Sequence, residues 1–251
     1  DRVALNPTAA ITRGVRRVAN RTGLALIVGY ALLGTASRVL LNGVFGAVLR
    51  RAGVASAGPA GPLAVDAPLP ALAAAASVLL VVATAFGVVS IRAVAADRGV
   101  PRASLLRNLG PVLVHALLGG VALAAVVLLG SALLVLPGVV AYVTFLFVPF
   151  VVALDDASVL AAFRESRALT AGNRLSPFGL LAAVTLAASL VLVAAAVLLA
   201  PPLSDAVGRS ASALATNLLL VPLSVATLGI QVEAFAQLRG LRFGQVAVEQ
   251  L

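Results

Sequence analysis

The stretch Ala71–Ile91, ALAAAASVLLVVATAFGVVSI, decides the fold of this chain. It contains no charged residue. Roughly 20 apolar residues in a helix span the hydrocarbon core of a bilayer, and only helices and closed barrels satisfy their backbone there. A helix on the surface of a water-soluble domain would carry a polar face instead. The stretch is therefore predicted to cross a membrane as a helix.

The composition of the whole chain supports the same environment. Hydrophobic residues make up 61% of the 251 residues and charged residues only 11%, and the mean hydropathy is +1.12. Soluble domains carry about 25% charged residues. The 18 basic residues are all arginine, and the chain has no cysteine, which excludes disulfides, thiolate metal sites and thiol catalysis.

Several further apolar segments have the length of a membrane crossing. We predict an all-α integral membrane protein with a single domain over residues 1–251, six transmembrane helices, and amphipathic interfacial helices on the cytoplasmic side. The crossings are expected near residues 22–49, 71–91, 110–136, 139–154, 178–199 and 214–238. Pro137-Gly138 is expected to separate the third and fourth crossings as a hairpin. The interfacial helices are expected near residues 7–21, 101–109 and 156–171.

The first interfacial helix has a clear start signal and two chemically different faces. Asn6-Pro7 supplies an N-cap followed by proline at the first helical position. At helical spacing one side holds Ile11, Val15 and Val18, and the other holds Arg13, Arg16, Arg17 and Asn20. This pattern is typical of a helix in the headgroup plane, and a solvated basic helix is the alternative. Asp155-Asp156 is expected to cap the interfacial helix over 156–171.

The arginines also predict the orientation of the chain. Fourteen of them lie near the crossing ends on one side, and the other four, Arg38, Arg50, Arg51 and Arg209, belong to the opposite side. Since arginine-rich loops stay in the cytoplasm, we expect a multi-pass protein of the cell membrane with both termini cytoplasmic. The candidate contacts for lipid headgroups or a partner are Arg13, Arg16, Arg17, Arg21, Arg102, Arg107, Arg164, Arg167 and Arg174.

The partners that these arginines favour are anionic lipids. The isoelectric point near 11.7 would also suit nucleic acid. However, the arginines adjoin hydrophobic segments, and aromatic residues, at 4%, are too few to stack bases. We therefore expect the lipid bilayer and anionic lipids, with a membrane-protein partner or a second copy as further options, and no nucleic acid.

Residues for catalysis are scarce. His115 is the only histidine, which leaves no two-histidine metal site, and without lysine no phosphate-binding P-loop forms. No catalytic residue, metal or cofactor is predicted, and the chain is not expected to be an enzyme. His115, Gln231 and Glu233 are expected at similar depth in the inner leaflet. They form either a polar pocket for transport or packing contacts with headgroups, Arg92 or Arg239.

Three short phrases suggest an internal repeat. They are Asn20-Arg21-Thr22-Gly23-Leu24, Arg107-Asn108-Leu109-Gly110, and Asn173-Arg174 followed by Gly179-Leu180. They fit three units of an interfacial helix plus a transmembrane hairpin. The alternative is that asparagine, arginine and glycine simply mark membrane entry.

One region resembles a known family. It contains Leu136-Pro137-Gly138, the segment through Phe147-Val148-Pro149, an acidic pair, and the phrase AFRESRALTAGNR over Ala162–Arg174. This order resembles the YciC-like group and the membrane domain attached to some glycerophosphoryl diester phosphodiesterases. The match is close over about forty residues and topological elsewhere. The resemblance implies a six-helix integral membrane protein without assigned catalytic residues, because the phosphodiesterase activity belongs to a separate soluble barrel.

The function expected from these observations is non-enzymatic. The chain is predicted to act as a scaffold, an envelope-maintenance factor or an accessory subunit that binds anionic lipid or a partner through cytoplasmic arginines. Two alternatives stay open at this point. One is a transporter of small solutes or lipids with an inner-leaflet polar pocket, and the other is a subunit of a membrane signalling or secretion complex.

Overall fold

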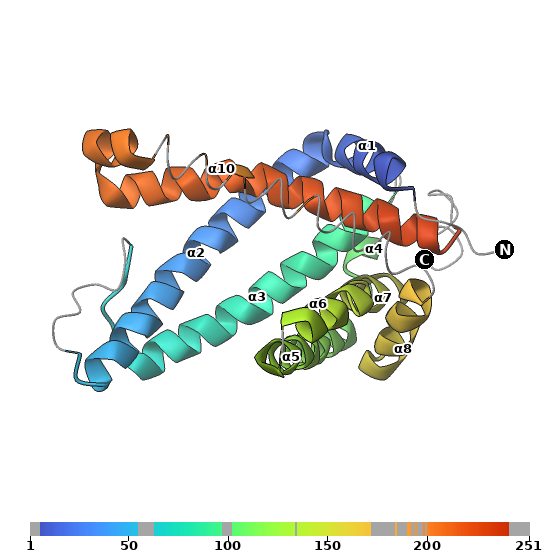
Figure 1. The fold of residues 1–251 in the computed structure, drawn as a ribbon, viewed down its shortest axis with the longest axis horizontal. Helices are drawn as coiled ribbons and strands as arrows, with labels where there is room; N and C mark the ends of the chain where they lie inside the picture. Colours follow the sequence, from blue (N-terminus) through green and yellow to red (C-terminus); the bar gives the residue numbers. More distant parts are fainter. Residues whose placement is uncertain are drawn as a thin grey trace. The chain divides into compact units, whose positions relative to one another are not determined.

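The computed structural model describes residues 6–54, 63–96, 102–133, 135–171 and 200–240, with residues 184, 190, 191, 194 and 198. The regular structure of these residues is helical, which confirms the all-α prediction. The helices are α1 (Pro7–Val18), α2 (Arg21–Arg51), α3 (Leu69–Ala95), α4 (Arg102–Leu105), α5 (Leu109–Leu133), α6 (Val135–Thr144), α7 (Val148–Asp155), α8 (Val159–Thr170) and α10 (Ala200–Leu238) (Figure 1).

Four helices in the described part of the chain, α2, α3, α5 and α10, are long and apolar enough to cross a membrane. They coincide with the crossings predicted at 22–49, 71–91, 110–136 and 214–238. The crossing predicted at 139–154 is divided between α6 and α7, and α7, with 8 residues, is only about 12 Å long. The crossing predicted at 178–199 lies almost wholly outside the described residues. The structure therefore supports a multi-pass membrane protein, and the number six stays a prediction.

The chain forms two compact units. The first unit contains residues 1–24, 84–185 and 226–251, and the second contains residues 25–83 and 186–225. All the arginines proposed as lipid or partner contacts belong to the first unit. In the second unit α2 and α3 approach at Gly43, where an added Cβ would lie 3.1 Å from Leu72 Cδ2. The prediction of a single domain over 1–251 stays a prediction.

Helix α7 is the centre of the first unit. It is apolar on all sides, and its residues from Val148 to Ala153 are buried, apart from Pro149. A helix without a polar face has to be covered all round. Helices α5 and α8 pack on it (Figure 1). Phe235 of α10 completes the cover, with its ring centroid 5.7 Å from that of Phe147 and 5.8 Å from that of Phe150.

The break between α6 and α7 is stabilised by α8. Pro149, in the first turn of α7, has no N–H to continue a helix through this point. The hydroxyl of Ser166 donates to the carbonyl oxygen of Thr144 (2.9 Å) and accepts from the amide of Phe147 (3.3 Å). The hydroxyl of Thr170 donates to the same Thr144 carbonyl (3.2 Å). Backbone groups freed by the break are thereby hydrogen-bonded within the protein.

Helices α5 and α6 form a hairpin, but the chain reverses earlier than predicted. Helix α5 ends at Leu133 and α6 begins at Val135, so Pro137-Gly138 lies in the first turn of α6. Proline is tolerated there because first-turn amides have no helical partner. A Cβ added to Gly130 would lie 3.0 Å from Gly138 Cα. These glycines therefore mark the close contact between the arms, and they do not form the turn.

Helices form in two of the three ranges predicted for interfacial helices, and the third range is only partly helical; their interfacial location stays a prediction. Helices α1 and α8 fall within the predicted ranges 7–21 and 156–171. In the predicted range 101–109 only the single turn of α4 forms before α5 begins. Arg92 donates to the carbonyl of Leu105, the last residue of α4, and to that of Arg107 in the turn that follows. Asn108, with φ 49°, is left-handed and separates the two helices.

The N-terminal helix α1 is attached to α10 through small residues. The Asn6 side chain accepts from the amide of Ala9 as the predicted N-cap. Ala10 and Gly14 are buried, and a Cβ added to Gly14 would lie 2.5 Å from Ile230 Cα. Ile11 and Val15 are 38% and 42% exposed. Thus α1 packs through its small side chains and leaves its larger apolar side chains free.

The close contact at Gly14 gives the first prediction. Gly14→Ala places a methyl group against the α10 backbone, which has no flexible atom to move aside, so we expect α1 to detach and the thermal unfolding temperature in detergent to fall. Gly87→Ala is the control, because a Cβ there meets nothing within 4 Å. An alanine inside a helix stabilises it by about 0.5–1 kcal/mol relative to glycine. Equal unfolding temperatures for both variants would show that α1 does not pack as described.

Candidate functional site

The predicted site residue Glu233 lies at the contact between α1 and α10. Its side chain is only 5% exposed. Its two oxygens lie 3.4 Å from Arg17 Nε and 3.6 Å from Arg13 Nη1. Gln237 Nε2 is 3.5 Å from Glu233 Oε1. Since a buried charge is strongly unfavourable unless it is paired, α1 supplies the cations that allow a carboxylate at this position.

Arg17 connects three helices rather than two. Besides Glu233, it donates through Nη1 to the carbonyl of Val94 (3.2 Å), one of the last carbonyls of α3 and without a partner inside the helix. The start of α1 is held as well, because the amide of Asn6 donates to Gln237 Oε1 (3.0 Å). Both ends of α1 are thus attached to the last three turns of α10.

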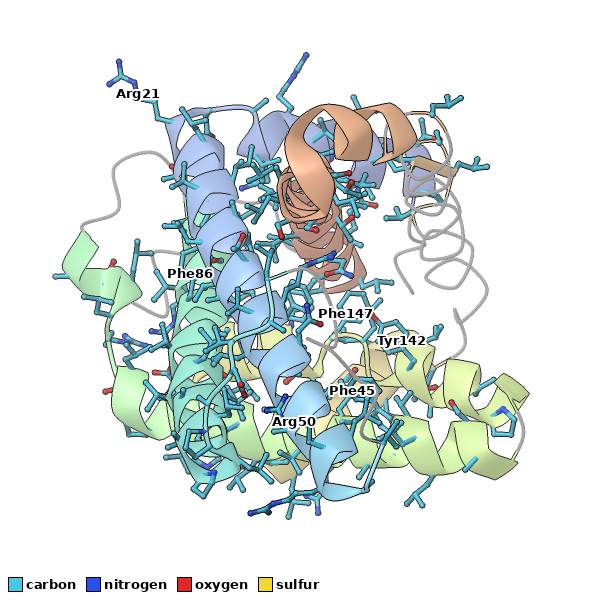
Figure 2. The ribbon with its side chains drawn as sticks, turned by 90° about the vertical axis from the view of Figure 1, so that its left-hand side faces the viewer. Arg21, Phe45, Arg50, Phe86, Tyr142 and Phe147 are labelled. Atoms are coloured by element: carbon cyan, nitrogen blue, oxygen red, sulfur yellow. The ribbon has the colours of Figure 1, made fainter. Side chains whose placement is uncertain are left out.

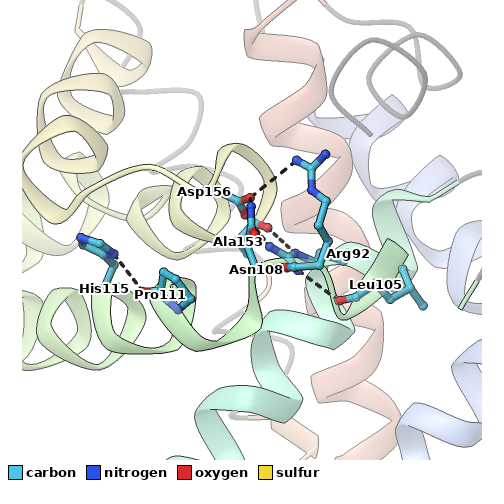
Figure 3. A network of polar contacts seen from close by, with 8 residues as sticks. Arg92, Leu105, Asn108, Pro111, His115, Ala153 and Asp156 are labelled. Atoms are coloured by element: carbon cyan, nitrogen blue, oxygen red, sulfur yellow. Dashed lines mark hydrogen bonds and ion pairs between the residues drawn. The ribbon is translucent and has the colours of Figure 1, made fainter. Parts of the chain in front are cut away.

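A second charged contact is centred on Arg92 at the end of α3, whose side chain is 9% exposed (Figure 3). Its Nε donates to the carbonyl of Ala153 (2.6 Å), and its Nη2 donates to Asp156 Oδ1 (2.6 Å). Its Nη1 donates to the carbonyls of Leu105 (3.1 Å) and Arg107 (2.6 Å). One guanidinium therefore joins α3 to the α4–α5 connection and to the C-terminal end of α7.

A third contact lies just after α10. Arg239 makes two hydrogen bonds with the carboxylate of Asp155, at 3.0 and 2.6 Å, and a further one with Glu165 of α8. Its guanidinium carbon also lies 4.5 Å from the centroid of the Phe235 ring. Burial lowers the pKa of Arg239, but hydrogen bonds and charge from Asp155 and then Glu165 outweigh it and leave the pKa raised. Arg239 therefore stays charged at physiological pH.

The acidic pair has a different role from the predicted one. Asp155-Asp156 was expected to cap the helix over 156–171, but Ser158 occupies the N-cap position of α8. Asp155 ends α7, and Asp156, with φ 52°, is its left-handed C-cap. Their carboxylates bind Arg239 and Arg92, respectively. The prediction was wrong because cationic partners distant in sequence compete better for these carboxylates than a neighbouring helix start.

Most of the predicted arginines are exposed, including Arg13, which pairs with Glu233, and Arg107, which pairs with Asp156. Arg13, Arg16, Arg21, Arg107, Arg164 and Arg167 are exposed, and Arg21 extends from the beginning of α2 (Figure 2). Within the described residues, no carboxylate lies at ion-pair distance from Arg16, Arg21, Arg164 or Arg167. Arg102 begins α4, its side chain lies outside the described part of the structure, and so does Arg174.

The predicted cluster of His115, Gln231 and Glu233 is not joined by the contacts found. His115 is half-buried, and its Nδ1 lies 2.9 Å from the carbonyl of Pro111 one turn earlier on α5 (Figure 3). Gln231 is half-buried on α10. Glu233 binds arginines of α1. Among the described residues, no three His, Asp or Glu side chains are grouped as a metal ion would require.

Arg92 and Arg239 are packing partners that the sequence suggests for Glu233 or His115. The structure gives both of them other partners, Asp156 for Arg92 and Asp155 with Glu165 for Arg239. A signal for this was present in the composition. The chain has only nine acidic residues, and an acid next to an apolar crossing is expected to be paired. The spacing along the chain did not show which arginine pairs with which acid.

The asparagines of the suspected repeat also differ in their contacts. Asn20 Oδ1 accepts from the amide of Gly23 and so caps α2 (3.0 Å). Asn108 instead directs its side-chain amide to Asp156 Oδ2 (3.0 Å). The third asparagine, Asn173, lies outside the described residues. The repeat stays a prediction.

Comparison with protein-family models, with curated proteins and with solved structures finds no match for this chain.

The Arg92 contacts give the second prediction. Arg92→Gln leaves Asp156 without its main cation and several carbonyls without a donor, so we expect a loss of about 3 kcal/mol in the free energy of unfolding in detergent. Arg92→Lys should recover little, because an ammonium group does not reach acceptors in three directions. Arg164→Gln, at an exposed position, is the control and should unfold like the wild type. Wild-type stability of Arg92→Gln would contradict this account.

Proposed function

We propose that this chain is a non-enzymatic multi-pass membrane protein that acts as a scaffold, an envelope-maintenance factor or an accessory subunit. Its arginine-rich end would bind anionic lipid or a partner at the cytoplasmic face. One observation carries the proposal. The described acidic residues of the first unit all form ion pairs that join different segments of the chain; they are Asp155, Asp156, Glu165 and Glu233. Four arginines are exposed and have no such partner among the described residues; they are Arg16, Arg21, Arg164 and Arg167.

This division of charges favours binding over chemistry. A general acid or base needs access to a substrate and a proton to exchange. Glu233 is instead covered and held by two guanidinium groups, and Asp155 is held by Arg239. The acids therefore fix the helices in place, and the exposed arginines give this end of the protein a positive surface.

The proposed orientation draws on the same contacts. The amide of Asn6 lies 3.0 Å from Gln237, so the beginning of α1 and the end of α10 share one depth. Arginines surround both positions in the sequence, which favours cytoplasmic placement. We propose that both termini are cytoplasmic in the cell membrane.

The six crossings are part of the proposal. Helices α6 and α7 together extend from Val135 to Asp155, about 30 Å if taken end to end, which is enough for one broken crossing. The segment 178–199 would add another. The resemblance to the YciC-like group supports this count. The phrase that carries the resemblance includes Ser166 and Thr170, whose hydroxyls donate to the Thr144 carbonyl at the break between α6 and α7. It also includes Glu165, which binds Arg239.

An orientation experiment tests this proposal. The chain has no native cysteine, so single cysteines report their own position. Thr8→Cys, Ala168→Cys and a cysteine appended after Leu251 should react with a membrane-impermeant maleimide only from the cytoplasmic side. Val54→Cys, in the connection that follows α2, should react only from the other side. Reaction of Thr8→Cys and the appended cysteine from opposite sides would refute the proposed topology.

The transporter alternative is tested by proton flux. Such a protein would use His115, Gln231 and Glu233, and Glu233 would have to leave Arg17 in each cycle. We expect vesicles containing the wild type to conduct protons no faster than protein-free vesicles, as followed with an enclosed pH-sensitive dye. Flux in the wild type that His115→Ala with Glu233→Gln abolishes would favour transport and overturn the scaffold proposal.

A further inference from the structure

Two helices of the first unit carry the same spacing of arginines. Arg13 and Arg16 lie on α1, and Arg164 and Arg167 lie on α8. Residues three apart are neighbours on a helix surface, with Cβ atoms about 5–6 Å apart. All four side chains are exposed. We call them the α1 arginine pair and the α8 arginine pair.

Each helix is held by a neighbouring charge that faces inward. On α1, Arg17 follows the arginine pair and binds Glu233 of α10. On α8, Glu165 lies between the two arginines of its pair and binds Arg239. The inward charge fixes the rotation of each helix. Arg164 and Arg167 are thereby held on the exposed side of α8, and Arg16 is exposed on α1. Arg13 is 67% exposed and also lies 3.6 Å from Glu233.

The two attachment points lie close together along the chain. Glu233 and Arg239 are six residues apart in the sequence, which corresponds to about 9 Å along a helix axis. The headgroup region of one leaflet is about 5–8 Å thick. The two arginine pairs are thus attached within a distance comparable to a single headgroup layer.

Exposed apolar side chains lie on both helices. Leu160, one turn before Arg164, is 71% exposed on the arginine side of α8. Ile11 and Val15 are exposed on the side of α1 opposite its arginine pair. A free phosphate ion would use the guanidinium groups alone. A phospholipid presents a phosphate next to acyl chains, and it therefore matches both kinds of exposed side chain at once.

We propose that each arginine pair binds the phosphate of one anionic phospholipid, so that this end of the protein holds two headgroup sites. This inference rests on the proposed function and specifies the partner of that surface. Guanidinium groups bind phosphate oxygens through paired, charge-assisted hydrogen bonds. Arg13 takes part although it lies 3.6 Å from Glu233, because its side chain is 67% exposed and Arg17 makes the shorter contact.

Native mass spectrometry of the full chain in detergent tests the proposal by titration with phosphatidylglycerol. We expect two bound lipids in the wild type and fewer with phosphatidylcholine. R13Q/R16Q and R164Q/R167Q should each weaken one site about 30-fold, taking about 1 kcal/mol for each arginine near an anionic headgroup and 1.4 kcal/mol per factor of ten. The quadruple variant should lose both sites.

Matched controls keep the result interpretable. R50Q/R51Q removes two arginines from the other end of α2 and should bind lipid like the wild type. R13K/R16K and R164K/R167K keep the charge without the paired hydrogen bonds, and they should bind more weakly than the wild type but better than the glutamine variants. They also stand in for any glutamine variant that does not fold, as judged by its unfolding temperature.

Four outcomes would overturn the inference. If the quadruple variant binds lipid like the wild type, the arginine pairs are not the lipid sites. The broader proposal would still stand if the wild type prefers anionic lipid. Complete displacement of lipid by equimolar inorganic phosphate would indicate an ion site. Loss of a co-purified protein from the quadruple variant with unchanged lipid binding would indicate a protein partner. No preference of the wild type for phosphatidylglycerol would also exclude anionic lipid from the broader proposal and leave a protein partner as the ligand of this surface.

Discussion

A carboxylate buried among apolar helices requires a cation beside it, and the first unit is organised by that requirement. Glu233, near the end of α10, pairs with arginines of α1. Arg239, just beyond α10, pairs with Asp155 of α7 and Glu165 of α8. The final turns of α10 therefore attach three other helices. Removing one partner of a fully buried pair costs about 3–5 kcal/mol, and partial exposure of Arg17 lowers that figure here.

Arginine rather than lysine is suited to these positions because of its shape. Arg92 donates in three directions to carbonyls of Leu105, Arg107 and Ala153 as well as to Asp156. An ammonium group is a compact point charge, and it does not cover acceptors arranged in a plane. These carbonyls belong to helix ends and a connection, where intrahelical partners are missing. The same side chain thus neutralises an acid and satisfies the backbone where three segments meet.

The sequence was sufficient for features that depend on local or periodic patterns. The long apolar helix over 71–91 follows from the absence of charge over its whole length, and the start of α1 follows from Asn6-Pro7. Features that depend on distant partners were out of reach. The local pattern at Asp155-Asp156 predicts a helix start. Only folding brings Arg92 and Arg239, which are distant in the sequence, to these acids. The carbonyl of Leu105, at the end of α4, likewise binds the side chain of Arg92, which belongs to another helix. For the candidate site, spacing identified Glu233 as an unusual acid within an apolar segment but not Arg17 as its partner.

The pairing of acids with inward arginines has a consequence for the arginines that remain. A membrane protein with 18 arginines and nine acids cannot neutralise itself, so part of its positive charge must meet something outside the chain. In the first unit the acids bind Arg17, Arg92 and Arg239, which lie between helices, and this leaves the excess on the outer faces of α1 and α8. The same two helices also expose apolar side chains, which are Ile11 and Val15 of α1 and Leu160 of α8. Water satisfies only the guanidinium groups, and hydrocarbon satisfies only the apolar side chains. The boundary between anionic headgroups and acyl chains satisfies both, and it exists on a membrane surface without any further protein.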